Sequence, residues 1–204
     1  MDRPARPAHP LAADAVALAD GILAALARRR ATGERVTAAG VARAAVARAD
    51  EWGVERTLLA DDPVLRELGV GEALGADGRE VLGWPDGRGR GWRELLGLEG
   101  PELTMGVTAP ALGVAERGTL VLETGPGHGR SIDVVSMYHL AVLPASRLRE
   151  TLAEALTETY AAGRRPPSAV SLVSAPSRTS DIEKISTLGA HGAKGLHLLV
   201  VEDR

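Results

Sequence analysis

Three largely apolar runs in the last third of the sequence constrain the fold more than any other feature. They are HLAVLP (139–144), AVSLVS (169–174) and LHLLVV (196–201). Strands without polar alternation are typical of a parallel sheet that is covered on both faces. Helical spacing fills the gaps between them, over 146–160, starting at Ser146, and over 181–189, where a glycine ends the segment. The pattern predicts a β-α-β-α-β unit with right-handed crossovers.

The preceding sequence predicts further elements of the same class. Apolar residues recur at intervals of three and four over 11–30 and 37–52, which predicts two helices, the second ending at Gly53. We also expect strands within 55–60, 80–83, 104–108 and 119–124, a short helix at 63–69, and a mobile loop or edge hairpin over 75–93. The predicted fold is α/β, with a mainly parallel central sheet, helices on both faces and an N-terminal helical extension. Its expected divisions are a flexible leader (1–10), a helical segment (11–53) and an α/β domain (54–204).

Composition excludes several kinds of site. The chain has no cysteine, so it contains no disulfide, no thiolate nucleophile and no cysteine-ligated iron–sulfur cluster. Its net charge of −3 provides no basic field for nucleic acid or an anionic membrane. No apolar run reaches the ~20 residues of a membrane helix. No secretory signal is visible, so we expect a cytoplasmic protein.

The segment SAPSRTSDIEK (174–184) is the first candidate site. It follows a predicted parallel strand and precedes a predicted helix, and α/β sheets bind ligands in the crevice at the carboxyl ends of their strands. Backbone N–H groups at a helix start favour an anion, and Ser177, Arg178 and Thr179 could hold a carboxylate or phosphate there. A structural reading stays open, because an S-x-x-E capping box begins at Ser180 and would satisfy the same N–H groups.

A second candidate is AERGTLVLETGPGHGR (115–130). Glu116 precedes a turn into a strand and Glu123 ends that strand, and either carboxylate could act as a base or nucleophile. Alternating glycines, which allow close backbone approach, follow at Gly125, Gly127 and position 129. Their spacing is neither the G-x-G-x-x-G of dinucleotide sites nor a P-loop.

The histidines do not form a metal-binding pattern. No H-x-x-x-H spacing occurs and no cysteine supports them, so no metal site is predicted. His139 and His197 lie near strand starts and are expected to be structural. His191, in a glycine loop beside Lys194, is the better candidate for a polar anchor or general acid/base. Ser136 has no visible triad partner.

Four stretches of the C-terminal half match a known family in order and spacing. They are AERGTLVLETGPG, HLAVLPASR, PSRTSDIE and LGAHGAKGLHLLVVED, within residues 104–203. Together they resemble the lactate utilization protein C group, also called the LUD domain family. The resemblance implies a fold of the NagB/RpiA/CoA-transferase-like group. It also implies work in oxidising L-lactate to pyruvate, with iron–sulfur clusters carried by partner proteins and no cofactor in this chain.

The resemblance assigns the motif residues one by one. The family's E-x-G-T motif corresponds to Glu116, Gly118 and Thr119. Its S-R-T-x-D-x-E motif corresponds to Ser177, Arg178, Thr179, Asp181 and Glu183. Its H-G motif corresponds to His191 and Gly192. Two departures, Arg117 in place of Thr and Ala193 in place of Pro, could alter the ligand.

The resulting prediction is an accessory protein or non-cluster subunit of an iron–sulfur L-lactate oxidation system. It would bind a small carboxylate or phosphate and form a homo-oligomer, with Glu116 as its candidate acid/base. One alternative is a stand-alone CoA-transferase-like or sugar-phosphate enzyme that uses a glutamate nucleophile. Another is a small-molecule sensor or interaction module.

Overall fold

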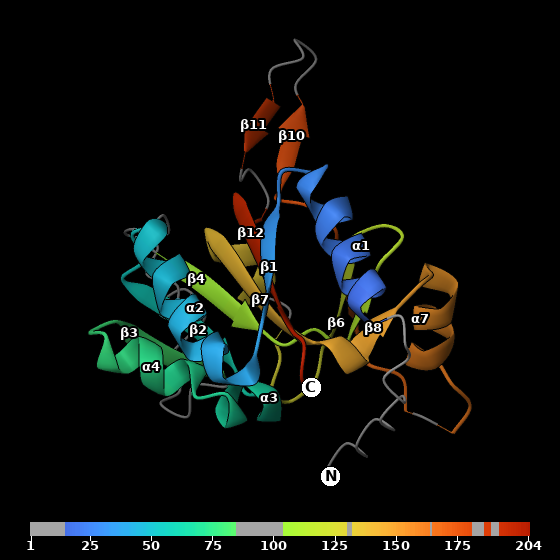
Figure 1. Cartoon of the computed structure of the whole chain (residues 1–204), viewed down its shortest axis with the longest axis horizontal. Helices are drawn as coiled ribbons and strands as arrows, with labels where there is room; N and C mark the ends of the chain where they lie inside the picture. The colour runs from blue at the N-terminus through green and yellow to red at the C-terminus, as the bar shows by residue number, and fades with distance from the viewer. Residues whose placement is uncertain (1–14, 85–103, 130–131, 164, 181–185, 189–191) are drawn as a thin grey trace.

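The computed structural model describes residues 15–84, 104–129, 132–163, 165–180, 186–188 and 192–204. A six-stranded sheet, parallel throughout, forms its centre (Figure 1). The order β1-β12-β7-β4-β2-β3 is formed by Thr32–Val36, Gly195–Val201, Tyr138–Pro144, Thr104–Thr108, Arg56–Ala60 and Glu80–Trp84. The predicted α/β fold with a parallel central sheet is therefore confirmed.

Helices cover both faces of this sheet (Figure 1). On one face lie α2 (Ala38–Glu51) and α4 (Val70–Ala76), preceded by the short α3 (Pro63–Glu67). On the other lie α1 (Ala15–Ala27) and α6 (Ile132–Val135).

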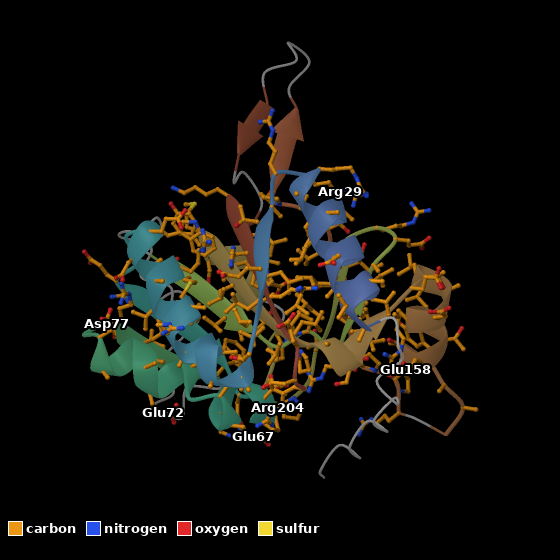
Figure 2. The ribbon with its side chains drawn as sticks, in the orientation of Figure 1. Arg29, Glu67, Glu72, Asp77, Glu158 and Arg204 are labelled. Atoms are coloured by element: carbon orange, nitrogen blue, oxygen red, sulfur yellow. The ribbon has the colours of Figure 1, made fainter. Side chains whose placement is uncertain are left out.

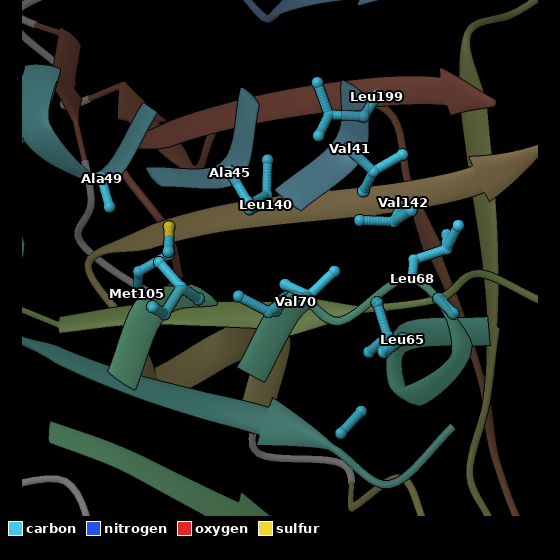
Figure 3. Packing of buried hydrophobic residues seen from close by; sticks show 14 of the residues in the cluster. Val41, Ala45, Ala49, Leu65, Leu68, Val70, Met105, Leu140, Val142 and Leu199 are labelled. Carbon is cyan, nitrogen blue, oxygen red and sulfur yellow. The ribbon is translucent and has the colours of Figure 1, made fainter. Parts of the chain in front are cut away.

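Alternate residues of the central strands pack against opposite layers. Val142 of β7 and Leu199 of β12 belong to the core cluster that contains α2 and α4 (Figure 3). Their neighbours Ala141 and Leu198 cluster with Ile22 of α1. Burial on both faces is the physical reason for these two largely apolar runs, because all their positions except His139 and His197 face a hydrophobic layer.

A second, four-stranded sheet has the order β8-β5-β6-β9 and is mostly antiparallel. Its strands are Leu148–Arg149, Leu112–Val114, Thr119–Glu123 and Val170–Val173. Helix α7 (Leu152–Thr159) packs on it through Ala155, beside the buried Leu112 and Val121.

The run AVSLVS does not join the parallel sheet, so the predicted β-α-β-α-β unit is wrong at its middle strand. It forms β9, which pairs antiparallel with β6 at the edge of the smaller sheet. The serines at positions 171 and 174 interrupt its apolar character, and Leu172 is 47% exposed. A half-buried edge strand needs no second covering layer.

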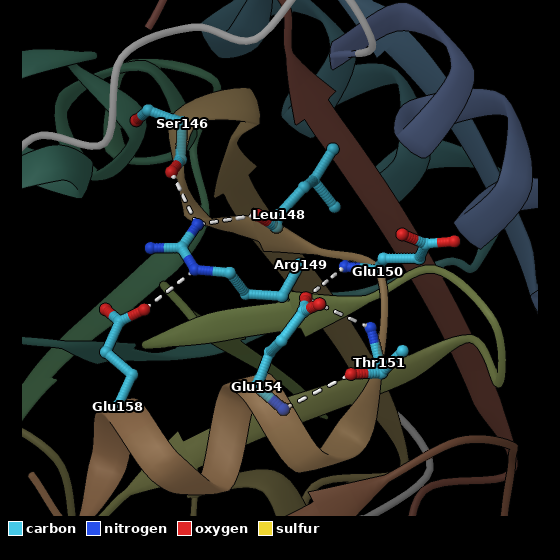
Figure 4. Close-up of polar contacts among 7 residues, drawn as sticks. All are labelled: Ser146, Leu148, Arg149, Glu150, Thr151, Glu154 and Glu158. Atoms are coloured by element: carbon cyan, nitrogen blue, oxygen red, sulfur yellow. Dashed lines mark hydrogen bonds and ion pairs between the residues drawn. The ribbon is translucent and has the colours of Figure 1, made fainter.

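The helix predicted from Ser146 begins later. Residues 145–147 form a short 3-10 turn, η2, and β8 follows before α7 starts at Leu152. Thr151 and Glu154 form a reciprocal capping box at this start, the Thr151 hydroxyl accepting from the Glu154 N–H (Figure 4). Because T-x-x-E is a stronger helix-start signal than a lone serine, the sequence already contained this boundary.

The helix predicted over 181–189 is wrong where the structure describes it. Ser186–Leu188 is a strand, β11, which pairs antiparallel with β10 (Arg178–Ser180). Residues 181–185 and 189 lie outside the described residues. Ser180 lies in β10, and the rest of the expected capping box, through Glu183, lies outside the described residues.

The N-terminal segment 11–53 contains both predicted helices and one strand that was not predicted. β1, TGERV, is an exposed edge strand that pairs parallel with β12. Its polar residues show no apolar periodicity, so nothing in the sequence indicated it. The predicted strand at 80–83 is confirmed as β3; the leader 1–10 and residues 85–93 lie outside the described residues.

Charged side chains are spread around the rim of the molecule (Figure 2). One ion pair, Arg204 to Glu67 at 2.5 Å, joins the end of the chain to α3. Among the described residues, none of the helices combines the length and hydrophobicity that crossing a membrane requires.

Candidate functional site

The S-R-T motif lies at the amino ends of the parallel strands and not at their carboxyl ends. The Ser177 N–H donates to the Ala193 carbonyl at 2.7 Å, and the Lys194 N–H donates to the Met137 carbonyl at 2.8 Å. The next residues, Gly195 and Tyr138, begin β12 and β7, respectively. The β10–β11 pair projects beyond this amino edge, at the top of Figure 1. The predicted location at the carboxyl edge is therefore wrong. The strand that leads into the motif, β9, belongs to the smaller sheet and not to the parallel one.

The E-x-G-T turn lies at the same edge of the molecule. Gly118 has a positive φ of 58°, and a Cβ there would lie 2.8 Å from the Leu26 nitrogen, near the end of α1. Helix α1 ends just before β1 begins, so this contact places the turn at the amino edge. The Thr119 hydroxyl is 2.7 Å from that of Ser174, which joins the turn to the segment leading to Ser177.

Neither predicted glutamate nucleophile is presented as a free reactive group. Glu116 Oε1 accepts a hydrogen bond from the Leu152 N–H at 3.1 Å, so this carboxylate stabilises the first turn of α7. Arg117 approaches the same oxygen at 3.5 Å. Glu123 is only 4% exposed at the other end of β6. A glutamyl-enzyme mechanism gains no support from this arrangement.

The glycine loop lies at the opposite edge of the central sheet. The Gly127 carbonyl accepts from the Asp61 N–H at 2.8 Å, directly after β2, and Gly125 is bridged to His128. A Cβ at Gly127 would lie 2.2 Å from the Asp61 carbonyl oxygen. These glycines therefore permit close packing on the end of β2. The structure separates them from Thr119, Ser177 and Gly192, which it brings to the amino edge; His191 lies outside the described residues.

A buried polar cluster beneath α6 was not predicted as a site. The His139 Nε2 atom is 2.8 Å from the Thr108 hydroxyl, and His128 Nε2 is 3.9 Å from the buried Asp133 carboxylate. Gly106 allows α6 to approach: a Cβ there would lie 2.2 Å from the Ile132 carbonyl oxygen and 3.0 Å from Ser136 Oγ. The sequence indicated this cluster only through the presence of a histidine, an aspartate and a serine within residues 133–139.

Burial controls the protonation of His139. It lowers the pKa of His139 to about 4; Asp133 opposes this shift and His128 adds to it slightly. His139 is therefore neutral at pH 7. Within the described residues, His139 Nδ1 and Ser136 Oγ have no hydrogen-bond partner, and both flank Gly106. Because unsatisfied buried polar atoms are rare, this is a place where a water or a hydroxyl group could bind.

The described residues contain no group of three or more His, Cys, Asp or Glu side chains arranged to hold a metal ion. The chemistry that the described side chains offer is therefore hydrogen bonding by hydroxyls and by a neutral imidazole beneath α6. The amino edge adds the half-buried Ser177 and Gly192 together with the ammonium group of Lys194. These features suit recognition of a small polar molecule more than covalent catalysis.

Comparison with known proteins places the chain in a family. The LUD domain profile matches residues 13–201. Lactate utilization protein C of Halalkalibacterium halodurans is 31% identical over 158 residues, which are 76% of this chain and 66% of that protein, just under two thirds. The uncharacterized protein YkgG of Escherichia coli is 32% identical over 173 residues, covering 83% and 73% of the two chains.

A structural comparison agrees on the fold. A crystal structure of a DUF162 family protein from Deinococcus radiodurans superposes with a TM-score of 0.64, over 92% of this chain and 98% of that one. At 18% identity this likeness shows the fold alone. The sequence match over nearly the whole chain carries the assignment: this chain belongs to the LUD domain family.

Proposed function

We propose that the chain acts in lactate utilization, as an accessory protein or subunit without its own cluster, in a system that oxidises L-lactate to pyruvate. The observation that carries the proposal is the similarity to relatives named Lactate utilization protein C, at 31% and 28% identity over 76% of this chain. The absence of cysteine supports the second part, because iron–sulfur clusters held by thiolates would have to belong to partner proteins.

The proposal includes a small anionic ligand bound at the amino edge. A backbone hydrogen bond brings Ser177 beside Ala193, and a hydrogen bond between the Thr119 and Ser174 hydroxyls links the E-x-G-T turn to the segment that leads to Ser177. Arg178 follows directly in the sequence and supplies a guanidinium to the same motif. A carboxylate such as that of L-lactate or pyruvate pairs well with a guanidinium and hydroxyl donors.

Growth tests the biological role. A bacterium lacking its own lactate utilization protein C should regain growth on L-lactate when it expresses this chain. Growth on glucose should be unaffected in all strains, which controls for toxicity. If the expressed, folded chain fails to restore growth, the proposed role in lactate utilization is contradicted. Co-purification of iron-containing proteins from the rescued strain would test the partnership separately.

Calorimetry tests the ligand. The wild-type chain should bind L-lactate or pyruvate, and Arg178→Ala should weaken the Kd by about tenfold or more, as expected for a charge-assisted hydrogen bond. Arg165→Ala, which removes an exposed arginine before β9, is the matched control and should bind normally. Unchanged binding by Arg178→Ala would remove this residue from the site.

A further inference from the structure

The geometry points to Lys194 as an anion-binding residue of the amino edge, held in place by the ring of Tyr138. The ligand it would contact is the carboxylate or phosphate group of a small molecule. This inference rests on the proposed function, since it adds a residue and a charge to the same site. Lys194 was noted in the sequence only as the neighbour of His191.

Composition makes this lysine informative. The chain has 24 basic residues, and only Lys184 and Lys194 are lysines. An arginine would satisfy a general need for positive charge in such a chain. The ammonium group differs from guanidinium in being a compact point charge with three donors that rotate freely. Its presence in the H-G-A-K-G motif suggests a site that fits one anionic oxygen at a time.

Backbone contacts hold Lys194 beside the S-R-T motif. Its N–H donates to the Met137 carbonyl at 2.8 Å, and the preceding carbonyl, of Ala193, accepts from the Ser177 N–H at 2.7 Å. Gly192 lies against Ser177, because a Cβ there would be 3.3 Å from the Ser177 Cβ. The two motifs therefore form one surface at the amino ends of β7 and β12.

A column of rings fixes the lysine side chain. Its Nζ atom lies 4.9 Å from the centroid of the Tyr138 ring. Tyr138 stacks on Trp52 at 4.7 Å with an interplanar angle of 12°. A Cβ at Gly195 would lie 2.8 Å from Tyr138 Cδ1 and 3.5 Å from Trp52 Cζ2, so the glycine lets the rings approach. Contact with an aromatic face orients the ammonium without neutralising it.

The two cations at the ends of this column differ in their partners. Arg48 lies 5.5 Å from the Trp52 ring centroid and forms an ion pair with Glu51 at 2.7 Å. For Lys194, the ring of Tyr138 is the partner that the structure shows; among the described carboxylates none forms an ion pair with it. Lys194 is half-buried, its ammonium rests against a ring, and none of the described carboxylates pairs with it, so it is suited to bind an anion.

Calorimetry on the full chain tests the inference, with L-lactate, pyruvate and inorganic phosphate as separate ligands. Lys194→Met keeps the aliphatic stem over Tyr138 and removes the charge, so it should weaken the Kd for the bound anion about ten- to hundredfold. Lys194→Arg should retain most of the binding. Arg66→Met makes the same change in net charge on the exposed surface of α3 and should bind like the wild type.

The outcomes separate this inference from the proposed function. If Arg178→Ala loses binding while a folded Lys194→Met, with an unchanged Tm, binds within twofold of the wild type, the inference is wrong and the proposed site stands. If the wild type binds none of the three ligands at millimolar concentration, both this inference and the proposed anion site are wrong. Preference for phosphate over both carboxylates, with weaker phosphate binding by Lys194→Met, would support Lys194 as an anion site and contradict lactate or pyruvate as its ligand.

Discussion

Acidification should destabilise the protein through two buried histidines. Burial lowers the pKa of His139 to about 4 and, with a smaller contribution from Arg48, that of His197 to about 3. The unfolded chain has a histidine pKa of about 6.5, so below that value it binds protons that the folded chain does not. The stabilisation from the neutral histidines is complete above pH 7. It is lost as the pH falls through 6.5, down to the folded pKa values.

The size of the effect follows from these pKa values. Between pH 7 and pH 5 each histidine should cost about 2 kcal/mol of unfolding free energy, because both folded pKa values lie well below 5. The two together should cost about 4 kcal/mol, a large part of the stability of a typical domain. Below pH 4 the two diverge, since only His197 continues to lose stabilisation.

Urea unfolding at pH 7, 6 and 5, followed by circular dichroism, would measure this loss. His139→Gln and His197→Gln should each reduce the fall in unfolding free energy between pH 7 and pH 5 by about 2 kcal/mol. A glutamine at 139 can still bond to the Thr108 hydroxyl, which lies 2.8 Å from Nε2 in the wild type. The carboxylates contribute equally to all three proteins and cancel in the comparison. The reasoning is refuted if the variants show the same pH dependence as the wild type.

Three substitutions test two close glycine contacts and one helix cap. Gly106→Ala should cost at least 1–3 kcal/mol by forcing its Cβ against the Ile132 carbonyl, and chemical denaturation should show the loss. Gly118→Ala should cost a similar amount, since it adds strain at φ 58° to a contact with α1; a variant as stable as the wild type would contradict this. Thr151→Ala should lower the unfolding free energy by about 1 kcal/mol through loss of the hydroxyl cap on the Glu154 N–H, whereas Thr151→Ser should keep it.

The middle strands of the central sheet could be predicted because their sequences allow few alternatives. The runs that became β7 and β12 are apolar at successive positions, and a strand of that kind must be buried on both faces. Helices α1 and α2 were equally clear from their periodicity, as was the end of α2 near Gly53, whose φ is 62°. The family could also be recognised from the sequence, because each of its motifs is a short continuous stretch of residues.

The placement of the site depended on tertiary pairing. Whether AVSLVS paired with β7 or with β6 decided the edge from which the chain enters the S-R-T motif, and strand pairing between distant segments leaves no local signal. Likewise, the sequence named His139 and Ser136 but could not show that Gly106, on a neighbouring strand, lets α6 bury them together. Local periodicity thus determined helices α1 and α2, the buried strands β7 and β12, and the fold class. The contacts among distant segments decided which motifs meet, because those contacts depend on the packing of whole layers.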